Sequence, residues 1–374
     1  MKRKITVVDL FCGGGGESTG IHQAAMLAGY DIKLTAVNHW ERAIETHAAN
    51  HPAAEHYCES IERLDPTKII PNMRLDLLWA SPECTHHSNA RGGRPRSDQS
   101  RASPWLILKW LQELCVERVI IENVPEFTSW GPLDRNGRPI QRQKGSTFRA
   151  FIQSLRSLNY TVDWRILCAA DYGAHTSRRR LFIQAVKGRK KILWPDITHT
   201  KEENNIFQLP PWKPSLEIID WTIPIPSIFS RKKPLAPATI RRIEYGIRKY
   251  WREATDPFLA VLYKMGTTRN IDNCPPTKKP FIIEYYGNGQ SHPLTIPLPT
   301  ITTKDRFSLV VGNDSLDIGF RMLQPHELAA ATGFPNNYKF CGTKAEKVKQ
   351  IGNAVPPAFA RAMFSTILGK EVRK

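Results

Sequence analysis

The segment Ile5-Thr-Val-Val-Asp-Leu-Phe-Cys-Gly-Gly-Gly-Gly16 decides the fold of this chain. Residues 5–10 are a short β-branched run typical of a buried strand, and a helical pattern begins at about Ser18. The glycines between them allow a sharp turn and let the backbone approach a ligand closely. Alone, this strand–turn–helix unit is a weak signal, because many nucleotide-binding proteins turn in this way.

The same alternation of strands and helices continues to about residue 190. The further strand candidates are residues 33–37, 75–79, 118–121 and 162–168. Short buried strands that alternate with helices indicate an α/β fold with a doubly wound, mostly parallel sheet. Dinucleotide-binding folds of this kind carry an acidic residue at the end of the second strand, for the ribose hydroxyls. Asn38 stands there in this chain, and it can hydrogen-bond a ribose without a charge.

A smaller, irregular unit is indicated between about residues 190 and 315, where prolines crowd in and the alternation fades. One helix is predicted there, at residues 237–254, with a stripe formed by Ile240, Ile243, Ile247 and Trp251. Its arginines and lysines fit either a solvated amphipathic helix or one that contacts phosphates. The pattern then becomes compact, with helices predicted at residues 324–332 and 354–368. We expect a main domain of residues 1–192 and 316–374 and a smaller domain of residues 193–315.

The composition favours a globular protein with a polyanionic partner. The 374 residues are 41% hydrophobic and carry a formal net charge of +18. Such a charge points to nucleic acid, with a solubilising surface as the alternative. Seven cysteines without a CxxC pair argue against disulfides and a zinc cluster. The absence of a signal peptide and of an 18-residue apolar run predicts a cytoplasmic protein that does not enter a membrane.

Cys84 follows the predicted strand at residues 75–79, at the sheet edge where ligands bind in such folds. The alternative is a buried structural cysteine. A polar, basic stretch follows it and looks like a mobile loop able to close over an anionic substrate; its arginines are Arg91, Arg94, Arg96 and Arg101. The His86–His87 pair has no ligand partners at suitable spacing, so no metal is predicted.

Charged residues also mark the ends of two other strands. Glu122 ends an apolar strand, where a carboxylate is costly unless it is used or paired. Strand alternation puts Arg178 and Arg180 on one face and Arg179 on the other. A solvated strand entrance is the alternative for these arginines.

Taken together and in order, six segments resemble the cytosine-5 DNA methyltransferase family. Three of the six carry substitutions. The segments are the turn at 9–16, the Pro-Glu-Cys loop at 82–84, Glu122-Asn-Val, the arginine strand at 176–180, the segment from Arg321 to Pro335, and Gly352-Asn-Ala-Val-Pro-Pro357. The resemblance implies a Rossmann-like methyltransferase fold, S-adenosylmethionine as cofactor and double-stranded DNA as substrate. It also implies a modification enzyme of a bacterium or phage, within a restriction–modification system, and we expect it to act as a monomer.

The resemblance implies roles position by position. Cys84 would be the nucleophile, Glu122 would bind the amino and ring-nitrogen edge of the cytosine, and Arg178 and Arg180 would hold the base oxygen and a nearby phosphate. The proline-rich insert would recognise the target, with Thr300 and Thr302 near its end. The cofactor would be bound by Phe11, Gly13, Gly15 and Gly16 at the turn, Asn38 at the ribose, Ser60 and Ile61 at the adenine, and Asn353, Ala354 and Val355 on the methionine side.

This chain departs from the family pattern beside the nucleophile. Glu83 and Thr85 flank Cys84 where the family has proline and glutamine, and a neighbouring carboxylate raises a thiol pKa unless it is neutralised. Thr176 and Gln324 are further substitutions, and Asn38 and Ser60 lack the usual acids. Three alternatives therefore stay open: transfer of a modified group or action on an unusual cytosine, an RNA substrate, and an inactive DNA-binding homologue.

Overall fold

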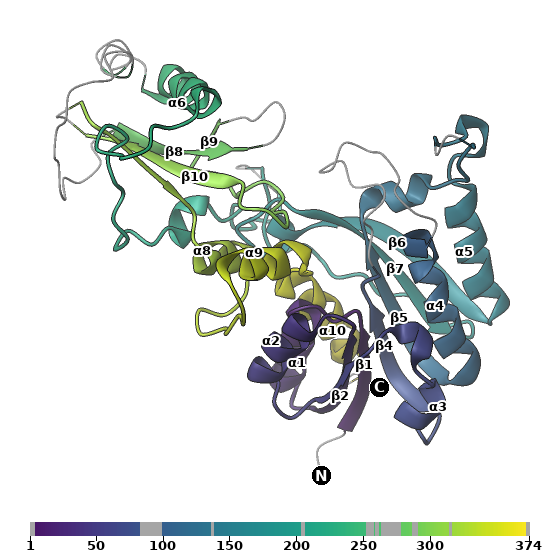
Figure 1. Ribbon diagram of the computed structural model, residues 1–374. Helices are drawn as coiled ribbons and strands as arrows, with labels where there is room; N and C mark the ends of the chain where they lie inside the picture. Colours follow the sequence, from purple (N-terminus) through teal and green to yellow (C-terminus); the bar gives the residue numbers. More distant parts are fainter. Residues whose placement is uncertain are drawn as a thin grey trace.

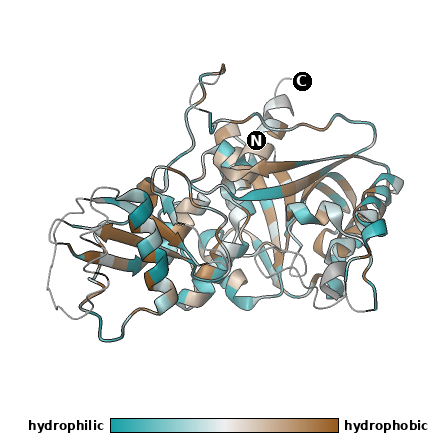
Figure 2. Ribbon diagram, turned by 90° about the horizontal axis from the view of Figure 1, so that it is seen from above, coloured by the Kyte–Doolittle hydropathy of each residue, from teal (hydrophilic) through white to brown (hydrophobic). Residues whose placement is uncertain are grey.

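The computed structural model describes residues 4–82, 99–135, 138–202, 206–251, 258, 262, 278–285, 291–313 and 316–371. Figure 1 shows a large sheet with helices on both faces and a separate, smaller sheet. The strands of both sheets are mainly hydrophobic, as the colouring of Figure 2 shows. Each sheet therefore supports a core of its own.

The large sheet has seven strands in the order β3-β2-β1-β4-β5-β7-β6. The strands β3, β2, β1, β4 and β5 are parallel, while β7 runs antiparallel to both β5 and β6. Their bounds are β1 Lys4–Leu10, β2 Asp31–Asn38, β3 Glu55–Cys58, β4 Arg74–Ala80, β5 Cys115–Asn123, β6 Tyr160–Cys168 and β7 Arg179–Lys187. The predicted α/β fold with a doubly wound, mostly parallel sheet is confirmed. Because the order reverses between β1 and β4, ligands are expected above the carboxyl ends of these two strands.

Helices cover both faces of this sheet because successive side chains of each strand point to opposite sides. On one face Val7, Leu77 and Phe182 pack against α1 and α10. On the other face Leu78 and Ile183 lie in the core that includes α4 and α5. The helices of this part are α1 Gly16–Ala28, α2 Glu41–Asn50, α3 Pro66–Ile69, α4 Gln99–Glu113, α5 Ser146–Ser157 and α10 Pro357–Glu371.

The small sheet is antiparallel, in the order β11-β10-β8-β9. Its strands are β8 Lys278–Glu284, β9 Ser291–Pro293, β10 Phe307–Gly312 and β11 Ile318–Met322. Helix α6, Pro237–Tyr250, packs Ile243 and Ile247 into the core of this sheet with Phe281. The predicted apolar stripe is therefore a core face. The domain division stays a prediction, and β11 pairs with the small sheet although it lies just beyond residue 315.

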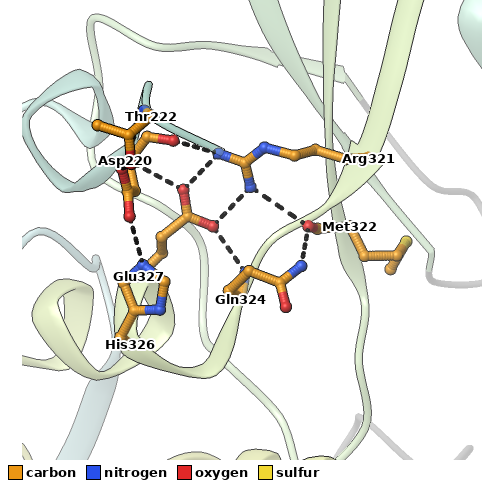
Figure 3. Close-up of polar contacts among 7 residues, drawn as sticks. All are labelled: Asp220, Thr222, Arg321, Met322, Gln324, His326 and Glu327. Atoms are coloured by element: carbon orange, nitrogen blue, oxygen red, sulfur yellow. Dashed lines mark hydrogen bonds and ion pairs between the residues drawn. The ribbon is translucent and has the colours of Figure 1, made fainter. Parts of the chain in front are cut away.

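A buried ion pair connects β11 to α8, Pro325–Thr332 (Figure 3). Both terminal nitrogens of Arg321 lie 2.7 Å from the carboxylate oxygens of Glu327. Nη2 of Arg321 also donates to the backbone oxygen of Asp220, and Oε1 of Glu327 accepts from the Asp220 amide. The pair therefore fixes the proline-rich segment to both elements. Helix α9, Lys344–Asn353, follows and leads into α10.

Candidate active site

A row of polar side chains crosses the carboxyl end of the large sheet. On the face covered by α1 and α10, the inner positions of the strands are mostly apolar, with Gln184 on β7 as a buried exception. The last positions on that face are Asp9 on β1, Ser81 directly after β4, Glu122 on β5 and Arg180 on β7. The sheet order puts these residues on neighbouring strands. The topology therefore gathers them where strand order predicts a ligand.

Glu122 lies between Ser81 and Arg180 in this row. Its carboxylate Oε1 lies 2.8 Å from Nε of Arg180, and both side chains are almost fully buried. Burial raises the pKa of Glu122, while the charges of Arg180 and Arg178 oppose the increase. Arg178 is buried and donates from Nη1 to the backbone oxygen of Ile301 at 2.8 Å, whereas Arg179 is exposed. Arg178 and Arg180 thus lie on the side of Glu122, as strand alternation indicates.

The segment that leads to the predicted nucleophile leaves the sheet at Ser81 and Pro82, beside the end of β5. Nδ2 of Asn123 donates to the backbone oxygen of Pro82 at 3.4 Å, and the amide of Ser81 donates to the backbone oxygen of Leu10 at 3.1 Å. These bonds tie the end of β4 to both neighbouring strands. The predicted loop residues lie outside the described residues, namely Glu83, Cys84, Thr85, Arg91, Arg94 and Arg96. Arg101 lies in α4, and only its backbone is described.

The glycine turn contacts the segment that precedes α10. Phe11, Gly13 and Gly15 have φ angles of 62°, 51° and 87°, so every second residue of the turn has left-handed backbone. A Cβ on Gly16 would lie 2.1 Å from the backbone oxygen of Val355. Only glycine therefore lets the turn touch this segment. The first and last of the predicted cofactor segments are brought together, with Ala354 and Val355 buried and Asn353 exposed.

The remaining predicted cofactor positions lie along the neighbouring strand ends. Oδ1 of Asn38 accepts a hydrogen bond from the amide of Trp40 at 2.9 Å. This atom therefore stabilises the turn between β2 and α2. The amide of Ser60 donates a hydrogen bond to Oε1 of Glu59 at 2.7 Å, and Ile61 is buried. The half-buried ring of Trp40 has the ammonium of Lys349 4.1 Å from its centroid.

The family model for the C-5 cytosine-specific DNA methylases matches residues 5–369. The chain belongs to this family. The methylase is 24% identical over 445 residues to the type II methyltransferase M.AgeI of Thalassovita gelatinovora, covering 96% of this chain and 98% of that protein. It is 24% identical to the type II methyltransferase M1.HphI of Haemophilus parahaemolyticus, covering 97% of this chain and 87% of that protein. The crystal structure of the S. pombe Dnmt2 methyltransferase has the same fold, with a TM-score of 0.59 at 16% identity over the full length of both chains.

Sequence reasoning did not select Trp40, which follows β2, or Glu17, which follows the glycine turn, although both lie beside predicted cofactor positions. Glu17 directly follows the four glycines and is only 2% exposed. Burial, followed by repulsion from Asp9, raises its pKa well above the usual range. An acidic residue immediately after a glycine turn, on a helix that packs against the sheet, was the available signal.

Thr300 and Thr302 lie on a segment that contacts both Arg178 and Gly352. On one side the segment is bonded to the arginines, because Ile301 accepts from Arg178 at 2.8 Å. On the other side a Cβ on Gly352 would lie 2.2 Å from the backbone oxygen of Thr302. Both threonines are half-buried. Their predicted contact with DNA stays a prediction.

The residues present fit a sulfonium cofactor with a planar base. A Cβ at Gly13 would meet nothing closer than the Phe11 backbone oxygen at 4.0 Å, so a ligand can approach the turn there, and Oδ1 of Asp9 is a buried polar atom without a hydrogen-bond partner among the described residues. In this part of the chain no group of three or more His, Cys, Asp or Glu is arranged to hold a metal ion. Nor does any helix of the described ranges have the length and apolarity to cross a membrane.

Proposed function

We propose that this chain is a DNA (cytosine-5-)-methyltransferase that transfers a methyl group from S-adenosylmethionine to carbon 5 of cytosine in double-stranded DNA. The observation that carries the proposal is the buried pair of Glu122 and Arg180, with 2.8 Å between Oε1 and Nε. The pair lies in one polar row with the strand end that leads to Cys84 and with the glycine turn. Family membership over residues 5–369 supports the same reaction.

Cytosine becomes reactive at carbon 5 only when its aromatic system is broken. The thiolate of Cys84 would add to carbon 6 and convert the ring to an enamine. Glu122 would hydrogen-bond ring nitrogen 3 and supply a proton as charge develops there. Its raised pKa favours the protonated form that this task needs. Once carbon 5 carries the transferred methyl group, loss of its proton to a base would expel Cys84 and restore the ring.

S-adenosylmethionine supplies the methyl group as part of a sulfonium cation. Phe11 and Gly13 to Gly16 would line the turn that holds it, and Ala354 and Val355 would close the opposite side. Trp40, Ser60 and Ile61 would bind the adenine. These residues would orient the cofactor towards Glu122.

Duplex DNA is the favoured substrate. The net charge of +18 supports binding to a polyanion, and the target base must leave the stack to reach a buried Glu122. Base flipping costs a few kcal/mol, which contacts between arginines and phosphates would offset. Relatives named as type II methyltransferases support a role in DNA modification within a restriction–modification system.

The test is transfer of labelled methyl groups from S-adenosylmethionine to duplex DNA by the purified chain. Cys84→Ala should abolish transfer, whereas Cys58→Ala should not, because Cys58 is an exposed cysteine on β3. Mass spectrometry of the digested DNA should find 5-methylcytosine. A different modified base as the product would contradict the methyl-transfer proposal.

A competition assay with transfer RNA decides between DNA and RNA. Transfer to RNA in preference to DNA would overturn the assignment of substrate. Absence of any transfer by a folded chain that binds DNA would support an inactive homologue instead.

A further inference from the structure

Asp9 and Glu17 form a pair of buried carboxyl groups behind the glycine turn. Asp9 is 0% exposed at the end of β1, and Glu17 is 2% exposed in the first turn of α1. Burial raises the pKa of Asp9 to about 8 and the pKa of Glu17 well above its usual range. Burial therefore favours the protonated form of both carboxyl groups. Two protonated carboxyl groups in one place can release a proton when a positive charge comes near.

Glu17 lies between the cofactor turn and the base-binding carboxyl. Its carboxylate accepts a hydrogen bond from Ser81, and Glu122 is close enough for its charge to raise the pKa of Glu17. A transferable methyl group has to lie between the turn and Glu122. The positive sulfonium of the cofactor would therefore come close to Glu17, a step that rests on the function proposed above.

A continuous chain of hydrogen bonds links Asp9 to the edge of the sheet. Oδ2 of Asp9 is 2.5 Å from Oγ of Ser18, which is 3.0 Å from Nε2 of His47. Nδ1 of His47 is 2.9 Å from Nε2 of His56 on the edge strand β3. Asp9, Ser18 and His47 are all fully buried, while His56 is half-exposed. The chain thus connects a buried acid to the surface.

The hydrogen bonds between Asp9 and His56 can be donated in either of two directions. With Asp9 protonated, each donor points outward, from Asp9 to Ser18, to His47 and to His56. With Asp9 ionised, each donor points inward and both histidines take the other tautomer, in which Nδ1 of His56 gives up its proton and its hydrogen bond to the Ala54 backbone oxygen. Burial lowers the pKa of His47 well below its usual range, which keeps this ring uncharged in both arrangements. Switching between the two arrangements moves one proton across the chain without moving a heavy atom.

We propose that Asp9 and Glu17 together sense the charge of the bound cofactor: when the sulfonium binds, Asp9 releases one proton through Ser18, His47 and His56, and it regains the proton when the neutral thioether remains. An ionised carboxylate beside the sulfonium stabilises the cation, and the released proton goes to the solvent. After transfer the cation is gone, and the carboxylate is again destabilised by burial. The pair therefore favours binding of the cofactor over binding of its product.

Other titratable groups face the pair from each neighbouring element. Cys12 lies in the turn, Glu122 on β5, and Tyr338 between α8 and α9. Burial raises the pKa of Cys12 and of Tyr338 further above their usual values, so neither loses a proton near neutral pH. Burial also lowers the pKa of His51 to about 4, which keeps the ring beside Tyr338 neutral. The carboxyl groups are thus the members of this cluster that can release the proton.

Isothermal titration calorimetry with the full chain tests the proposal. S-adenosylmethionine and S-adenosylhomocysteine are titrated at one pH in buffers of different ionisation enthalpy, which yields the number of protons released. The two ligands share their amino and carboxyl groups, so a difference in proton number reports the sulfonium. We expect release of up to one proton for S-adenosylmethionine alone. At pH values below the pKa of the pair, the affinity for S-adenosylmethionine should then increase up to tenfold for each unit by which the pH rises. The affinity for S-adenosylhomocysteine should stay constant.

Asp9→Asn should abolish the difference in proton release, and Glu41→Gln should preserve it, because Glu41 is exposed in the first turn of α2. His56→Gln should keep the number of protons and slow their release in a stopped-flow indicator assay. Equal proton numbers for the two ligands in the wild-type chain would overturn the proposal even if a variant fails to fold. If both ligands bind and methyl transfer proceeds, only this inference fails. If neither binds, the proposed function fails with it.

Discussion

Arg180 holds its Nε 2.8 Å from Oε1 of Glu122, yet burial still raises the pKa of that carboxyl. The two effects act in opposite directions, and desolvation is the larger. Arg178 adds a second positive charge from the same side of β7. Glu122 is therefore fixed in place by the arginines while keeping a tendency to hold a proton.

The first prediction concerns Glu122. Glu122→Gln should reduce the rate of methyl transfer about 10²–10⁴-fold, because an amide can hydrogen-bond the base but cannot supply a proton. In the wild-type chain the rate should decrease as pH rises through the raised pKa of Glu122, since the protonated form acts. The measurement is the single-turnover rate against pH. Glu117→Gln, on the same strand but in an exposed pair with Lys190, should behave as the wild type.

The second prediction concerns the buried ion pair of Arg321 and Glu327. Arg321→Met should lower the free energy of unfolding by about 3–5 kcal/mol, because Glu327 would be left buried without its partner. Urea denaturation measures the change. Arg248→Met removes an exposed pair with Glu244 on α6 and should cost about 0.5 kcal/mol or less. Similar losses in the two variants would show that the buried pair does not organise this region.

The third prediction concerns the contact of Gly16 with Val355. Gly16→Ala should destabilise the fold by about 1–3 kcal/mol, because the new Cβ would overlap the Val355 backbone oxygen at 2.1 Å. Cofactor affinity should decrease as the turn moves away from this segment. Gly369→Ala is the matched control, since its Cβ would meet open space in α10, and it should gain up to about 1 kcal/mol. Unchanged stability and affinity of Gly16→Ala would rule out the close packing of the two segments.

The fourth prediction concerns acid stability. His51 has its pKa lowered by burial from 6.5 to about 4, so the folded chain binds fewer protons than the unfolded chain in this range. Its contribution is present above pH 6.5 and is lost as pH falls towards 4, by roughly 3 kcal/mol at most. Comparing the pH dependence of unfolding in the wild type and His51→Gln measures it, with the exposed His39→Gln as control. A steeper loss of stability in His51→Gln than in the wild type would contradict this assignment.

Much of the fold could be predicted because its signals are local. The strand at residues 5–10, the turn after it and the apolar run that ends at Glu122 each follow from spacing and residue type. The edge strand β3 was not predicted, since Glu55–Cys58 is short and carries no apolar alternation. The stripe on α6 was predicted, but its partner Phe281 lies far away in sequence. Whether that helix contacts a core or a ligand could not be read from its own residues.

The sequence by itself determined the family, the α/β class and the alternation that puts Arg178 and Arg180 on one side of β7. These depend on neighbours in the chain and on glycines that permit left-handed backbone. Only the tertiary structure decided that Asp9, Glu17 and Glu122 lie in one buried polar cluster and that a hydrogen-bonded chain runs from Asp9 to His56. The protonation of a carboxyl depends on burial and on charges brought from other strands, and neither is encoded within any single segment.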